Sequence, residues 1–120
     1  MNVQETLQVA VKAIDEKNGH DVNTLDMRGI SLVADYFVVC HGNSETQVEA
    51  IAHEVKSQAQ KSGIDVGRIE GIESARWVLI DLSDVVIHIF HKEERPYYNI
   101  EKLWSDAPQV DVKRLLETRS

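Results

Sequence analysis

The segment 77–90 holds the residues whose types could do chemistry, two carboxylates and a histidine. Asp81 and Asp84 are three residues apart, and His88 follows them. Metal-dependent nucleotidyl transfer needs two acidic residues spaced two apart on a strand, because such side chains share a face and hold magnesium together. Asp81 and Asp84 flank a turn instead. Their spacing therefore argues against this reaction.

The other candidate sites are also incomplete. Gly42-Asn-Ser44 precedes a helix, where a phosphate could bind, but it lacks the lysine of a phosphate-binding loop and the glycines of a dinucleotide fingerprint. A plain strand-to-helix turn explains it better. The five histidines form no metal-ligand pattern. Cys40 and His41 are adjacent on a strand and point to opposite faces. We expect no catalytic residues, no metal site and no cofactor.

Residues 77–90 are predicted to form a β-hairpin with a tight turn at Ser83-Asp84. Because strand side chains alternate, one face is purely aliphatic and must be buried; it carries Val78, Ile80, Leu82, Val85, Ile87 and Ile89. The opposite face, called the mixed face below, carries Trp77, Leu79, Asp81, Val86, His88 and Phe90. Aromatic anchors among charges are typical of partner contact. A helix over this face, with His88 a satisfied core histidine, explains the composition equally well.

Hydrophobic periodicity predicts the elements that position this hairpin. Apolar spacing from Val3 to Ile14 indicates a first helix, which Asn18-Gly19 stops. A second helix begins at Ser44, where Gln47 completes the form of a capping box, and it ends at Gly63. Its buried stripe is predicted to be Val48, Ile51, Ala52, Val55 and Ala59.

Short strands are predicted over 22–27 and 66–72, and the continuous apolar run 36–40 is typical of a central strand covered on both faces. Residues 30–35 fit either a loop or a short helical turn. The resulting order is α-β-β-α-β-β-β with helical turns at the C-terminal end. It predicts a single α/β domain in which helices pack on a mixed β-sheet.

Composition narrows the functional classes. A chain of 120 residues with 42% hydrophobic and 28% charged residues is typical of one soluble globular domain. No apolar run approaches the ~20 residues of a membrane span, and we expect no secretory signal. The single cysteine, Cys40, is predicted to be a small buried hydrophobe, which favours the reducing cytoplasm. The net charge of −7 argues against broad binding to nucleic acid and permits a basic partner.

Four sequence blocks together resemble the ribosomal silencing factor (Iojap-like) family. The blocks are Leu25-Asp-Met-Arg-Gly-Ile-Ser31 with Ala34-Asp-Tyr-Phe-Val38; Gly42-Asn-Ser44 with Gln47-Val48 and Ala50-Ile-Ala52; Glu70-Gly71 with Trp77-Val-Leu-Ile-Asp81 and Asp84-Val-Val-Ile-His-Ile-Phe90; and Arg95, Tyr98, Glu101-Lys-Leu-Trp104 and Asp106-Ala107. The resemblance covers 1–107, the expected family domain, and leaves 108–120 as a polar C-terminal tail. Ser83 departs from the family, which usually has glycine in the hairpin turn.

The resemblance implies a nucleotidyltransferase-like sheet without the catalytic acids, in a protein that is not an enzyme. It implies a translation repressor that binds ribosomal protein uL14 on the large (50S) subunit. Occupying that surface sterically prevents the subunits from joining when nutrients fall. Little direct contact with ribosomal RNA and no membrane contact are expected, and a homodimer of the free protein is left open. The alternative is a nucleotidyltransferase-like enzyme or a nucleotide-binding module.

We assign the partner contact to the mixed face. Trp77 is the expected central anchor, and Asp81 and Asp84 are expected to pair with lysine or arginine of the partner. The rim is expected to contain Glu70, His88, Arg95 and Tyr98. For Arg95, a salt bridge to Glu101 or a bond to a helix carbonyl is an equal alternative. Trp104 is expected to pack the last helical turn onto the body.

Overall fold

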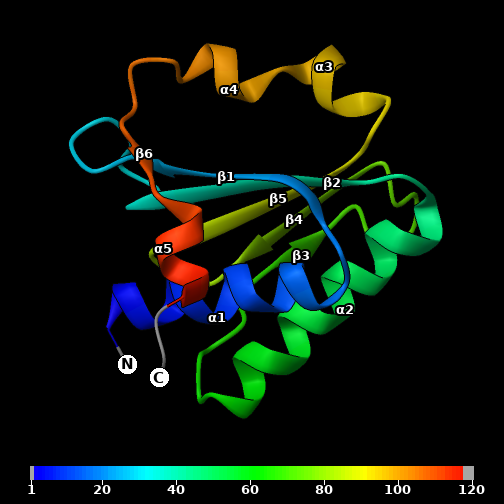
Figure 1. Ribbon diagram of the computed structural model, residues 1–120, viewed down its shortest axis with the longest axis horizontal. Helices are drawn as coiled ribbons and strands as arrows, with labels where there is room; N and C mark the ends of the chain where they lie inside the picture. Colours follow the sequence, from blue (N-terminus) through cyan, green and yellow to red (C-terminus); the bar gives the residue numbers. More distant parts are fainter. Residues whose placement is uncertain (1, 118–120) are drawn as a thin grey trace.

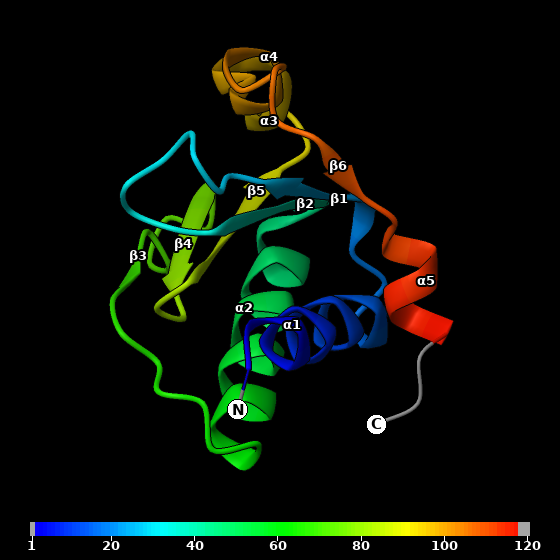
Figure 2. The same cartoon turned by 90° about the vertical axis from the view of Figure 1, so that its left-hand side faces the viewer.

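A six-stranded mixed sheet forms the centre of the computed structural model, which describes residues 2–117. Helices α1 and α2 cover one face, and the short helices α3 and α4 lie on the other side (Figures 1 and 2). The strand order is β3-β4-β5-β2-β1-β6, and β2 with β5 is the parallel pair. The elements are α1 (Val3–Glu16), β1 (His20–Asp26), β2 (Tyr36–Gly42), α2 (Glu45–Lys61), β3 (Ile69–Glu70), β4 (Trp77–Asp81), β5 (Val85–His91), α3 (Glu94–Tyr98), α4 (Ile100–Leu103), β6 (Gln109–Val110) and α5 (Val112–Glu117).

Local sequence signals set the ends of the two long helices. The Asn2 side chain accepts a hydrogen bond from the backbone of Glu5 and caps α1, and Asn18 leaves the helix with a φ of 58°. In α2 the Ser44 hydroxyl accepts from the backbone N–H of Gln47 at 3.1 Å. All five predicted stripe residues of α2 are buried. The predicted helices are therefore confirmed.

Gln47 does more than complete a capping box. Its side-chain oxygen accepts from the backbone N–H of Asn43 rather than of Ser44, and its amide nitrogen donates to the carbonyls of Lys17 and Asn18. These bonds tie the start of α2 to the end of α1. A Cβ on Gly42 would meet the backbone nitrogen of Val48 at 3.0 Å, so this glycine allows close packing of strand and helix.

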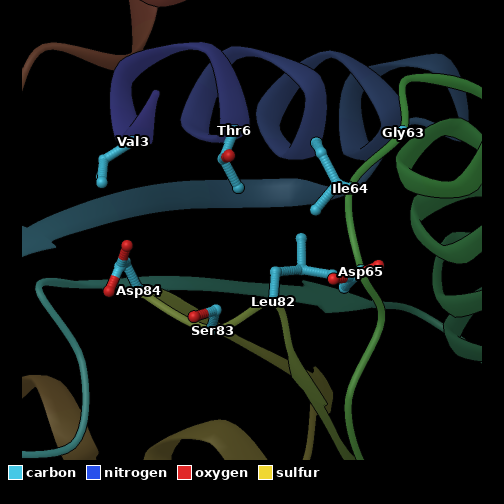
Figure 3. A pocket seen from close by; sticks show the side chains of 8 residues that line it. All are labelled: Val3, Thr6, Gly63, Ile64, Asp65, Leu82, Ser83 and Asp84. Carbon is cyan, nitrogen blue, oxygen red and sulfur yellow. The ribbon is translucent and has the colours of Figure 1, made fainter. Parts of the chain in front are cut away.

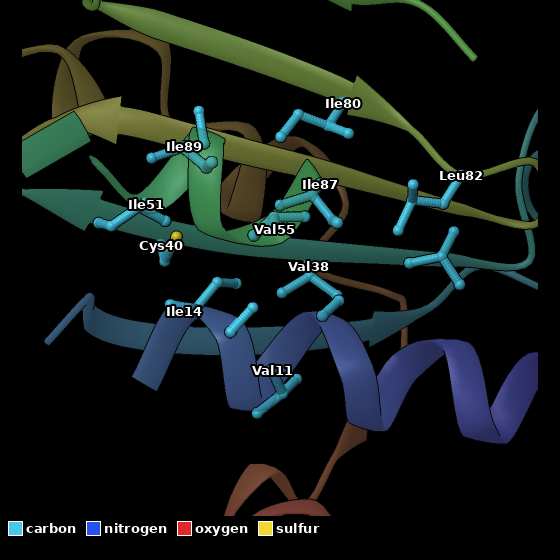
Figure 4. Close-up of a cluster of buried hydrophobic side chains, with 14 of the residues drawn as sticks. Val11, Ile14, Val38, Cys40, Ile51, Val55, Ile80, Leu82, Ile87 and Ile89 are labelled. Carbon is cyan, nitrogen blue, oxygen red and sulfur yellow. The ribbon is translucent and has the colours of Figure 1, made fainter. Parts of the chain in front are cut away.

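The hairpin has the predicted register. Val78 pairs with Ile89 and Ile80 with Ile87, and the backbone N–H of Leu82 donates to the carbonyl of Val85 across the turn. The aliphatic face is fully buried against α1 and α2, as Figure 4 shows. Cys40 lies in the same core, where burial raises the pKa of its thiol to about 12. It is therefore a small buried hydrophobe, as predicted.

The structure changes the predicted element list in three places. Residues 27–35 form a loop with a turn, in which the backbone of Ile30 and Ser31 donates to Met27, and no helix. The strand predicted over 66–72 shortens to Ile69–Glu70. Beyond residue 107, Val110 pairs with Thr24, and Leu115 of α5 is buried against α1.

The described part of the polar C-terminal tail is thus packed on the domain, and residues 118–120 lie outside the described residues. Within residues 2–117, no helix is long and apolar enough to cross a membrane. The fold is a single α/β domain with a mixed sheet and packed helices, as the sequence predicts.

Candidate functional site: the mixed face of the hairpin

Trp77 is the centre of an aromatic cluster at one end of the mixed face. Its ring stacks on Phe90, with 5.0 Å between centroids, and lies 4.6 Å from the ring of Tyr98 on α3. Its Nε1 donates a hydrogen bond to Nδ1 of His88 at 3.2 Å. Trp77 remains half-buried, and Tyr98 is exposed. Both rings are therefore held in place and still present surface to a partner.

His88 lies beneath this surface rather than on its rim. His88 is only 6% exposed, and the ring of Phe37 packs edge-on against it with 4.9 Å between the ring centroids. Burial lowers the pKa of His88 to about 4, so the imidazole is neutral at pH 7. Because Nδ1 accepts from Trp77, the proton is on Nε2, which has no hydrogen-bond partner among the described residues. His88 is therefore a buried histidine, as the alternative interpretation predicts. Only one of its two ring nitrogens has a hydrogen-bond partner among the described residues, so it is not fully satisfied.

Arg95 is also not a free rim residue. Its guanidinium makes two hydrogen bonds to Glu101, at 2.8 and 3.0 Å, and its side chain is 11% exposed. It also donates to the carbonyl of His20 and contacts Nδ1 of His41 at 2.9 Å. Asn23 donates a further hydrogen bond to Glu101. Arg95 therefore forms the salt bridge to Glu101 that was the alternative to a partner contact. The carbonyl that it also bonds belongs to β1 and not to a helix.

We call this set of bonds the Arg95 network, and it fastens the α3–α4 segment to β1 and β2. Burial opposes ionisation of Glu101, but the hydrogen bonds from Arg95 and Asn23 outweigh it, so the pKa of Glu101 lies below its ordinary value. Burial and then the charge of Arg95 lower the pKa of His41. An ionised Glu101 and a neutral His41 are the protonation states that can both accept hydrogen bonds from the Arg95 guanidinium. The network therefore holds Tyr98 over Trp77.

Asp81 lies at the other end of the face, whereas Asp84 is in the hairpin turn and lines a cavity beside the start of α1. Asp81 accepts a hydrogen bond from the backbone of Ser83 at 2.8 Å and so supports the turn. Asp84 is exposed, and its carbonyl accepts from the backbone of Asp35 and Tyr36. Glu70 is exposed and pairs with Arg68 at 3.1 Å. In residues 2–117 no group of three or more acidic, histidine or cysteine side chains could hold a metal ion.

A cavity of about 270 Å³ opens beside the hairpin turn, between it and the start of α1 (Figure 3). Its polar side chains are Thr6, Asp65, Ser83 and Asp84, and no lysine or arginine lines it. Two carboxylates without a cation oppose an anionic ligand. This cavity is therefore unsuited to a nucleotide.

Two features of this face were missed by the sequence analysis. Phe37 of β2 is half-buried and contacts both His88 and Trp104, whose ring centroid lies 6.2 Å away. Trp104 thus packs the end of α4 onto the sheet, as predicted. Within residues 2–117 the exposed large hydrophobic side chains lie in two segments. Ile30, Leu32 and Val33 belong to the loop before β2, and Tyr97, Tyr98 and Leu103 belong to the α3–α4 segment. The apolar residues Ile30, Leu32 and Val33, which follow Gly29, were the available signal for the first segment.

Comparison with known proteins shows the family of this chain. The family model described as "Ribosomal silencing factor during starvation" matches residues 1–120. The chain belongs to the ribosomal silencing factor family. It is 60% identical to the ribosomal silencing factor of Halalkalibacterium halodurans over 97% of this chain and 99% of that protein. It is 59% identical to the one from Bacillus subtilis, over 93% of this chain and 95% of that protein.

A crystal structure of a protein from Bacillus halodurans has the same fold. It is 61% identical to this chain, the TM-score is 0.81, and the match covers 90% of this chain and 98% of the other. The ribosomal silencing factor family is a regulatory family. The third and fourth blocks of the sequence resemblance contain the hairpin and residues of the α3–α4 segment. The family blocks therefore meet at the mixed face.

Proposed function

We propose that this protein binds ribosomal protein uL14 on the large subunit through the mixed face and sterically blocks association with the small subunit. The supporting observation is the pairing of a half-buried Trp77 with an exposed Tyr98 on the sheet face opposite α1 and α2, where α4 packs over Phe90 and Trp77 stays partly exposed. Membership of a ribosomal silencing factor family supports the ribosome as the target. Lower translation under nutrient limitation is the expected result.

The chemistry of the face suits a basic protein partner. Trp77 and Tyr98 supply large rigid surfaces, which commonly carry most of the free energy of an interface. Asp81 supplies negative charge at the opposite end and Asp84 adds charge at the adjoining turn, in a chain whose net charge is −7. Glu70 forms an ion pair with Arg68 and would contact the partner at the rim of the interface. His88 and Arg95 support the anchors from below and from the side rather than contacting the partner.

This proposal places the protein in the cytoplasm, with little direct contact to ribosomal RNA and none to a membrane. The excess of negative charge opposes phosphate groups. Self-association of the free protein through the same face would compete with ribosome binding. The enzymatic alternative, a nucleotidyltransferase or nucleotide-binding module, has no support in the cavity beside the hairpin turn.

Sedimentation in a sucrose gradient tests the proposal. Added protein should travel with purified large subunits and deplete the peak of whole ribosomes formed when small subunits are added. A Lys56→Ala variant on the exposed side of α2 should behave like the wild type, since α2 lies on the opposite face of the sheet. Protein that stays at the top of the gradient at micromolar concentration contradicts the proposal. A calorimetric titration with magnesium and nucleoside triphosphates tests the enzymatic alternative, and we expect no heat of binding.

A further inference from the structure

The loop between β1 and β2, residues 27–35, presents apolar side chains that the fold does not use. Leu32 is 107% exposed and Val33 is 78% exposed, so neither is buried in the domain. Burying such apolar side chains is favourable, and the monomer gains little of that stabilisation here. Contiguous exposed apolar groups of this kind are typical of an interaction site.

The base of the loop is firmly built. Met27 is fully buried, and its backbone N–H donates to the carbonyl of Asp35 at 2.7 Å across the neck of the loop. Arg28 makes a two-pronged ion pair with Asp26 and lies over the ring of Tyr36. Ala34 is buried at the other end. The exposed tip is therefore held at a defined position, which lowers the entropic cost of binding through it.

This position adjoins the mixed face. The loop rises on the same side of the sheet as α3 and α4 (Figures 1 and 2). Met27 shares a small apolar cluster with Phe37 and Trp104, and Phe37 contacts His88 of the mixed face. The loop and the α3–α4 segment therefore lie beside the same patch of sheet and carry the exposed apolar side chains of the described chain between them.

The charges around the loop indicate its occupant. The backbone of Asp35 and Tyr36 bonds to the carbonyl of Asp84, which brings the loop against the hairpin turn. The arginines of this region, Arg28 and Arg68, are already paired, with Asp26 and Glu70. Asp35, Asp81 and Asp84 add negative charge beside them. An apolar tip with an acidic surround fits a basic protein surface that has an apolar depression. A second copy of this acidic chain would bring like charges together.

We propose that the 27–35 loop is a second contact of the partner-binding surface, with Leu32 and Val33 as apolar anchors on the basic ribosomal protein. This inference rests on the proposed function. The partner is then held on two sides, by the loop and by the Trp77–Tyr98 pair. Loss of the apolar anchors should act on the dissociation rate, while loss of the Asp84 charge should act on the association rate and its salt dependence.

The test is a double variant, Leu32→Ser with Val33→Ser, compared with the wild type and with a Lys56→Ser control on α2. We expect at least a tenfold loss of affinity for purified large subunits, measured by co-sedimentation at several protein concentrations. The melting temperature should be unchanged, because both side chains are exposed. Asp84→Asn should weaken binding at low salt and have little effect at high salt.

The outcomes separate this inference from the function on which it rests. If wild-type protein does not bind large subunits, the proposed function and this inference both fail. If the wild type binds and the double variant binds equally well, the inference alone is overturned. The inference is also overturned if the double variant binds large subunits normally but no longer self-associates in analytical ultracentrifugation. The loop would then bind a second copy of this chain.

Discussion

The indole Nε1 of Trp77 donates a hydrogen bond to Nδ1 of His88, diagonally across the β4–β5 pair, with 3.2 Å between the nitrogen atoms. This bond fixes the plane of the indole and the tautomer of the imidazole together. The residue proposed as the main anchor is therefore oriented by a buried group that a partner does not reach. The Trp77–His88 hydrogen bond thus links the stability of the hairpin to the shape of the binding face.

Trp77→Ala should abolish binding to large subunits at modest concentration while the domain stays folded. Removing an aromatic anchor commonly costs 2 kcal/mol or more of binding free energy, which is roughly a thirtyfold loss of affinity. Because Trp77 is half-buried, we also expect about 1–2 kcal/mol of lost stability. Thermal melting and co-sedimentation on the same variant separate the two effects. A variant that is mostly unfolded at the binding temperature would contradict the anchor role, and Trp77→Phe is the milder control.

Stability should fall as the pH drops from about 6.5 towards 4, because burial lowers the pKa of folded His88 to about 4. The unfolded imidazole takes up a proton in this window and the folded one does not, so protonation favours unfolding. Up to about 3 kcal/mol should be lost across it.

Urea denaturation of wild type and His88→Gln at several pH values measures this slope. The Gln variant should show a flatter dependence on pH. His41 also has a lowered pKa and contributes with the same sign, so His41→Gln is the matched comparison. Equal slopes for His88→Gln and the wild type would show that His88 does not carry the effect.

Breaking the Arg95 network should loosen the α3–α4 segment. Arg95→Ala leaves a partly buried Glu101 without its cation, so we expect about 2 kcal/mol of lost stability and faster hydrogen exchange over residues 94–104. The double variant Arg95→Ala with Glu101→Gln should recover part of this loss, because the uncompensated charge is gone. Exchange in this segment that matches the wild type would contradict the role of the network.

Asp81→Lys should weaken binding by placing a positive charge against a basic partner. The substitution also removes the bond to the backbone of Ser83, so Asp81→Asn is the informative control. The amide oxygen keeps that bond and loses only the charge. We expect intermediate affinity for Asn and a smaller dependence of binding on salt than in the wild type. Affinities for large subunits that are identical in all three proteins would exclude Asp81 from the interface.

Ser83→Gly should stabilise the hairpin. Ser83 has a φ of 72°, in the left-handed region where a side chain is strained and glycine is not. Relief of strain should raise stability by about 0.5–1 kcal/mol, which thermal melting can measure. A lower melting temperature would show that entropy of the unfolded chain outweighs the strain.

Local patterns by themselves determined the two long helices, the Ser44 cap of α2 and the hairpin with its two faces. Alternation and helical spacing depend on neighbours within a few residues, so the stripe of α2 and the pairing of Val78 with Ile89 could be read from the sequence. The order of the four blocks was enough to place the chain in its family. Burial of Cys40 in a continuous apolar strand was equally predictable.

Only the tertiary structure decided which side chains of the mixed face remain available to a partner. The salt bridge of Arg95 to nearby Glu101 was open to prediction, but Arg95 also donates to the carbonyl of His20 in β1, far away in the chain, and no local pattern encodes that contact. His88 is buried because rings from β2 and β4 enclose it. Leu32 and Val33 look like core residues in the sequence and become surface residues because their loop leaves the sheet. Exposure depends on distant segments packing together, whereas periodicity depends on neighbours alone.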